Sequence, residues 1–198
     1  MSSPALTARS TPKRRSLPSG MWGMALFLSG ETMLFAGMIA SYFYLDFRDS
    51  RWPPAGVAHP QVLDPSILTA VLVASTAPMA LAARRAKAGE RRGTIAMLAL
   101  AAVVQSGYLA YQLHQFVGEV HTLHPQTSAY ASAYIALLGL HHAHVLVGVL
   151  LDLGLVFWIV ASGLSDYRVT GVRALALYWY VINAIAVAIL LTEISPTL

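Results

Sequence analysis

The sequence predicts an all-α membrane protein, a bundle of five transmembrane helices. Three observations indicate this class. Of the 198 residues, 57% are hydrophobic and only 11% are charged, whereas a soluble domain carries about 25% charged residues. The apolar residues gather in five stretches, each close to the ~20 residues that a helix needs to cross a bilayer. The alternation of apolar and polar residues that marks transmembrane β-strands is absent, which favours helices.

These stretches define the expected helices and the segments between them. Residues 1–18 are basic and are expected to form a cytoplasmic tail, and residues 19–198 form the membrane domain. The connection at 46–64 contains Trp52-Pro53-Pro54, which predicts an ordered outer loop, and the connection at 118–129 contains Glu119. The expected helices cover residues 21–45, 65–83, 93–117, 130–161 and 174–195.

The basic residues predict the orientation of the bundle. With five crossings, eleven of the thirteen Lys and Arg residues lie on one side, and only Arg48 and Arg51 lie on the other. Basic residues accumulate on the cytoplasmic side of membrane proteins. We therefore expect the amino terminus in the cytoplasm and the carboxyl terminus in the periplasm. Because the charges adjoin membrane spans, they favour this topological role over nucleic-acid binding.

Polar groups deep in the apolar stretches are the first candidate functional residues. Glu31 lies near the middle of the first stretch, and His141, His142 and His144 lie well inside the fourth. A charge at this depth costs about 2.5–3.5 kcal/mol on insertion scales, so such side chains face protein or a polar cavity. A rise of about 1.5 Å per residue places Glu31 and His141 at similar depths. This allows a hydrogen bond between Glu31 and a histidine of the fourth helix, either for structure alone or for proton exchange.

Helical spacing groups further polar residues on two faces. The third helix carries Gln105, Tyr108, Gln112 and Gln115, and the fourth carries His141, His144, Gly148 and Asp152. Residues at steps of three and four share one side of a helix. Since two polar faces cannot both meet lipid, we expect them to meet each other or a partner subunit.

Residues closer to the ends of the stretches are expected at the membrane surfaces. Asp152 and Glu193 are predicted to be solvated or interfacial. Tyr178 and Trp179 are predicted to be aromatic anchors at the interface.

The chain has no cysteine, so disulfides and thiolate metal sites are excluded.

Short motifs along the chain resemble subunit III of the haem-copper oxidases, in its five-helix bacterial form. The matching residues are Trp22-Gly23-Met24, Phe27-Leu28, Glu31, Phe35-Ala36-Gly37, Tyr42-Phe43-Tyr44, Trp52-Pro53-Pro54 with Gly56, Ala74-Ser75, Gln112, Gly139 with His141, His144 through Gly148, and Tyr178-Trp179. The chain departs from the family pattern at Gln115, where an acidic residue is usual. It also departs at Tyr180, Asn183 and Ala186, where histidine, aspartate and tryptophan are usual.

The resemblance implies an accessory, non-catalytic subunit of a respiratory complex in the bacterial inner membrane that reduces oxygen to water. The haems and copper would lie in partner subunits, with direct packing against subunit I and association with subunit II. The chain would hold phospholipid, stabilise the catalytic subunit, and support proton uptake and oxygen access. In this chain we expect no catalytic, cofactor-binding or metal site.

Three alternative classes of function compete with this expectation. Within the same family, the complex can be a quinol oxidase or a nitric oxide reductase assembly. An intrinsic haem site is disfavoured because bis-histidine ligation needs two facing helices, whereas His141 and His144 share one. A small secondary transporter would explain Glu31, but the sequence shows no inverted repeat or pair of broken helices.

Overall fold

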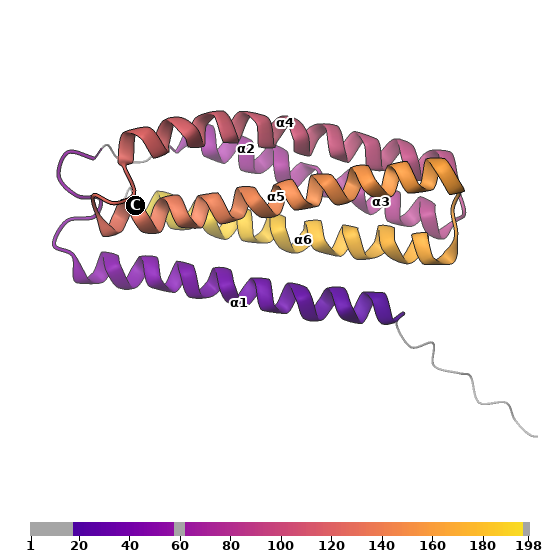
Figure 1. Cartoon of the computed structure of the whole chain (residues 1–198), viewed down its shortest axis with the longest axis horizontal. Coiled ribbons are helices and arrows are strands. Elements are labelled where there is room, and N and C mark those ends of the chain that lie inside the picture. Colours follow the sequence, from indigo (N-terminus) through magenta and orange to yellow (C-terminus); the bar gives the residue numbers. More distant parts are fainter. Residues whose placement is uncertain (1–17, 58–61, 196–198) are drawn as a thin grey trace, which may run out of the picture.

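The computed structural model describes residues 18–57 and 62–195, and its described part is helical without strands (Figure 1). The helices are α1 (Ser19–Arg48), α2 (Leu63–Ala74), α3 (Thr76–Lys87), α4 (Arg91–Leu123), α5 (Ala129–Ser162) and α6 (Asp166–Ile194). Five stretches among them are long and apolar enough to cross a membrane. The predicted fold class is therefore confirmed. The orientation of the termini stays a prediction, and the expected basic tail lies outside the described residues except for Pro18.

The second membrane span is interrupted at Ser75, between α2 and α3. Pro78 has no N–H to donate to the carbonyl four residues earlier, so it weakens the helix at this point. Two polar side chains donate to the carbonyl of Leu72, just before the break. Ser75 Oγ donates to the Leu72 carbonyl at 2.6 Å, and Asn183 Nδ2 of α6 donates to the same oxygen at 3.1 Å. At this break, α6 is thus bonded to the end of α2.

Several helices extend beyond the apolar stretches that predicted them. α6 begins at Asp166, well before residue 174, because the Ser165 side chain caps it by accepting from the Arg168 N–H. α4 continues to Leu123, so Glu119 lies in a helix and not in the loop predicted at 118–129. Hydropathy marks the part of a helix inside the hydrocarbon core, whereas caps decide where the helix ends.

The helices pack unequally (Figure 1). α2 to α6 form a compact group, whereas α1 lies along one side and contacts only α5 and α6 among the described helices. Most of α1 is exposed in the isolated chain, with Leu26 and Met33 more than 70% exposed. An apolar surface of this kind faces lipid or another membrane subunit.

Close contact between α5 and α6 depends on Gly148. A Cβ atom there would lie 2.6 Å from Trp179 Cζ2 and 2.9 Å from Tyr178 Cε1. Both rings are buried, and each is fixed by a hydrogen bond to α5. Only glycine allows this approach without displacing a ring.

The loop between α1 and α2 packs against the end of the bundle. The Trp52 ring lies 5.1 Å from the rings of both Tyr42 and Tyr130, measured between centroids. This part of the predicted ordered loop therefore contacts two helices. Residues 58–61 of the same loop lie outside the described part of the chain.

Candidate functional site

Glu31 and His144 form a hydrogen-bonded pair between α1 and α5. Glu31 Oε2 lies 2.8 Å from His144 Nε2, and the other ring nitrogen, Nδ1, lies 2.8 Å from the Leu140 carbonyl oxygen. Both residues lie near the middle of their helices. The structure thus pairs Glu31 with His144, one turn from the His141 that depth counting singled out.

The two hydrogen bonds determine where protons lie in this pair. A carbonyl oxygen only accepts, so His144 Nδ1 carries a hydrogen. If the ring is neutral, Nε2 is an acceptor and the Glu31 carboxyl must donate; if the ring is protonated, Nε2 donates to a carboxylate. Both states hold one proton between Oε2 and Nε2. Removing that proton would leave two acceptors facing each other at 2.8 Å, so deprotonation requires one of the bonds to break.

The surroundings fix the histidine more firmly than the glutamate. Phe35 packs edge-on against the His144 ring with centroids 5.2 Å apart, and the Tyr178 hydroxyl donates to the His144 carbonyl at 2.7 Å. The side chains of His144 and Glu31 are 14% and 19% exposed. A small part of the pair is therefore accessible in the isolated chain.

A second polar group lies in the core. We call Ser75, Gln105, Asp152 and Trp179 the core polar cluster; all four are buried. Trp179 Nε1 donates to Asp152 Oδ2 at 2.8 Å. With its amide nitrogen turned toward Asp152, Gln105 donates to the same oxygen at 2.7 Å, while its amide oxygen lies 3.2 Å from Ser75 Oγ. The polar faces predicted for two helices thus meet at Gln105 and Asp152.

Burial corrects the predictions for Asp152, Glu193, Tyr178 and Trp179. Asp152 is 0% exposed and Glu193 is 7% exposed, so neither side chain is solvated as predicted. Trp179 and its neighbour Tyr178 are also buried and are not interfacial anchors. Distance from the end of an apolar stretch estimates depth but not the side of the helix on which a residue lies. Each of these residues faces a neighbouring helix.

His141 and the adjacent His142 are buried side by side in α5, with ring centroids 6.0 Å apart. Neither ring has a hydrogen-bond partner among the described residues. Phe116 of α4 packs edge-on against His142 at 5.2 Å. Neighbouring histidines of one helix do not present nitrogens to opposite faces of a haem, so this arrangement does not fit bis-histidine ligation. The sequence placed His142 among the polar groups at depth, but helical spacing did not assign it to the polar face of its helix.

The remaining residues of the α4 face lie between the core and one end of the bundle. The Tyr108 hydroxyl accepts from Gln112 Nε2 at 3.4 Å. Gln112 and Gln115 line a cavity together with Glu119 and Glu193. Glu119 lies four residues after Gln115 and so continues the polar face of α4. The same helical spacing could therefore have identified it from the sequence. The predicted residues are therefore divided: Glu31 pairs with His144, Gln105 and Asp152 belong to the core polar cluster, and Gln112 and Gln115 line the cavity, with Tyr108 bonded to Gln112. His141 is buried separately, beside His142.

Comparison with known proteins identifies the family. The model of the family "Cytochrome c oxidase subunit III" matches residues 13–193. The chain is 30% identical over 189 residues to cytochrome c oxidase subunit 3 of Bacillus sp. (strain PS3), covering 93% of this chain and 91% of that protein. It is 26% identical to the subunit 3 of Thermostichus vulcanus, covering 82% and 80%, and 25% identical to quinol oxidase subunit 3 of Bacillus spizizenii, covering 84% and 80%. The chain belongs to the cytochrome c oxidase subunit III family.

Proposed function

We propose that this chain is the accessory subunit III of a respiratory haem-copper oxidase and that it stabilises the catalytic subunit by helix packing in a bacterial inner membrane. The family match over nearly the whole chain is the observation that carries this proposal. The exposed apolar side chains of α1 and the other helices supply surface for subunit I, subunit II and phospholipid. The haems and copper of the complex are proposed to lie in the partner subunits.

The Glu31–His144 pair is proposed to support proton uptake. It holds one proton between two side chains at mid-membrane depth and is partly accessible in the isolated chain. Intramembrane carboxyl and imidazole groups commonly form proton relays. The pair can accept or release that proton only by changing its hydrogen bonds, so proton exchange is coupled to the contact between α1 and α5.

Three variants of the purified oxidase complex test this role. Glu31→Gln keeps the side-chain shape and a hydrogen bond to His144 but cannot exchange a proton, so we expect normal subunit content and faster decay of oxygen consumption during sustained turnover. Glu31→Ala removes the partner of His144 at a cost of about 1–3 kcal/mol, so subunit content also falls. Asp49→Asn, an exposed charge-matched control, should behave as wild type.

The measurement is oxygen consumption against time at matched subunit content. If the glutamine variant follows the wild-type curve throughout, Glu31 has only a packing role. A separate observation tests the subunit assignment itself, because the chain should co-purify from native membranes with a haem-containing subunit. Recovery of the chain without any haem protein would refute the assignment.

A quinol oxidase is the second candidate for the parent complex. The similarity to the quinol oxidase subunit 3 of Bacillus spizizenii covers 84% of this chain. The electron donor distinguishes the two, since a cytochrome c oxidase oxidises reduced cytochrome c and a quinol oxidase oxidises a quinol. Assaying the purified complex with both donors identifies the parent complex.

A further inference from the structure

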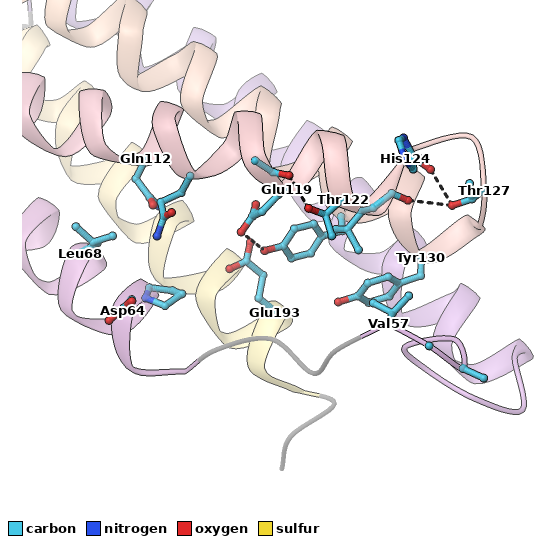
Figure 2. Close-up of a pocket in the computed structure, with 17 residues that line it drawn as sticks. Val57, Asp64, Leu68, Gln112, Glu119, Thr122, His124, Thr127, Tyr130 and Glu193 are labelled. Atoms are coloured by element: carbon cyan, nitrogen blue, oxygen red, sulfur yellow. Dashed lines mark hydrogen bonds between the residues drawn. The ribbon is translucent and has the colours of Figure 1, made fainter.

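The cavity at the loop end of the bundle has properties that the role in the oxidase does not use. It has a volume of about 790 Å³ and lies among α2, α4, α5 and α6, at the end where the α1–α2 and α4–α5 loops lie (Figure 2). We call this space the end cavity. Its volume falls within the range of about 300–1,000 Å³ typical of small-molecule sites.

Among the described residues, the charged side chains that line the end cavity are acidic. Three carboxyl groups line it, from Asp64 of α2, Glu119 of α4 and Glu193 of α6, and its described lining contains no Lys or Arg. Asp64 is exposed, whereas Glu119 is partly buried and Glu193 is only 7% exposed. In the close-up, Glu119 and Glu193 point toward one another beside a tyrosine hydroxyl (Figure 2). The described part of the cavity therefore attracts positive charge.

Two carboxyl oxygens in the end cavity are buried without a hydrogen-bond partner among the described residues. They are Glu193 Oε1 and Glu119 Oε2. The other oxygen of Glu119 accepts from the Tyr134 hydroxyl at 3.3 Å. Buried polar atoms in proteins nearly always have partners, and an unpaired buried carboxylate is strongly unfavourable. These two oxygens thus lack the donor or the positive charge that would satisfy them.

Aromatic residues beside the carboxyl groups indicate the kind of cation. The rings of Tyr130 and Tyr134 stack with centroids 5.9 Å apart and line the same cavity. An ammonium group supplies several N–H donors for carboxyl oxygens, and it is attracted to aromatic faces. Leu68 and Val57 add apolar surface to the lining, which suits a carbon chain attached to that group.

We infer that the end cavity binds an organic ammonium ion, with Glu193 and Glu119 as its counter-ions and Tyr130 and Tyr134 as its aromatic wall. The ammonium group can belong to a soluble amine or to the headgroup of an aminophospholipid. Glu193 carries most of the interaction because it is the most buried of the three acids.

The first test titrates spermidine, a soluble amine, into the purified full-length chain by isothermal calorimetry at constant ionic strength. Glu193→Gln keeps the shape of the side chain and removes its charge, so we expect affinity to fall about 30-fold, the loss that corresponds to about 2 kcal/mol for one member of a buried charge pair. Glu90→Gln makes the same change of net charge outside the cavity, where Glu90 forms an exposed ion pair with Arg85. This control should bind as wild type does.

The second test identifies the source of the ammonium group. The chain is reconstituted with phosphatidylethanolamine or phosphatidylglycerol, and the retained lipid is measured by native mass spectrometry. Loss of phosphatidylethanolamine alone in Glu193→Gln supports a headgroup ligand, whereas unchanged lipid with weakened spermidine binding supports a soluble amine. The inference is overturned if wild type binds neither, or if Glu193→Gln binds both as wild type does. None of these results depends on the assignment to an oxidase.

Discussion

Replacing Gly148 with alanine should destabilise the bundle far more than a single methyl group suggests. The new Cβ would lie 2.6 Å from Trp179 Cζ2, 2.9 Å from Tyr178 Cε1 and 3.0 Å from Trp179 Cε2. Contacts this short must be relieved by moving α6 or by turning the rings. Neither ring turns freely, because Trp179 donates to Asp152 and Tyr178 donates to the His144 carbonyl.

The size of the effect follows from these contacts. Overpacking a dense core costs about 1–3 kcal/mol, and displacing Trp179 also weakens a buried hydrogen bond worth about 1–3 kcal/mol. The gain in helix propensity from glycine to alanine offsets about 1 kcal/mol. We therefore expect the free energy of unfolding to fall by about 1–5 kcal/mol.

A matched control lies on the same helix. Gly154→Ala introduces the same methyl group at a position where, apart from the adjacent residues and the backbone of its own helix, no atom lies within 4 Å. It should be neutral or slightly stabilising, by up to about 1 kcal/mol. The assay is unfolding of the full-length chain by sodium dodecyl sulfate, followed by circular dichroism. Equal unfolding midpoints for the two alanine variants would refute the close α5–α6 contact at Gly148.

Two further predictions concern the core polar cluster and the topology. Trp179→Phe removes the N–H that donates to Asp152, so the free energy of unfolding should fall by about 1–3 kcal/mol in the same assay. Trp158→Phe, at a position 48% exposed, is the control. An equal change in both variants would contradict the buried hydrogen bond. A reporter enzyme fused after Leu198 should be active in the periplasm and one inserted at Ala88 active in the cytoplasm. The reverse pattern would contradict the positive-inside orientation.

The fold could be predicted because membrane-crossing helices depend on a simple quantity, the length of an apolar stretch. Glu31 could be singled out for a related reason, since a carboxyl group inside such a stretch needs a partner. The sequence did not determine which histidine is that partner. His141 and His144 differ by one helical turn, and depth counting from expected helix ends is accurate only to about one turn of 5.4 Å. The structure selects His144.

Burial of single residues near helix ends could not be predicted from hydropathy. Asp152 and Glu193 are buried because α6 and α4 approach from particular directions, and those directions depend on contacts such as the one at Gly148. The break in the second span was visible in principle from Pro78. Asn183, which donates to the Leu72 carbonyl beside this break, lies 111 residues from Leu72 along the chain, so only the fold brings them together.

The position of α1 at the side of the bundle has a consequence for biogenesis. Glu31 and His144 are 113 residues apart in the sequence, which at about 5–20 residues per second separates their synthesis by about 6–23 s. Both helices that α1 contacts, α5 and α6, are made after it. During this interval His144 is not available to Glu31. Docking of the first helix is therefore a late event in the formation of the subunit, and the glutamate becomes paired only when the chain is nearly complete.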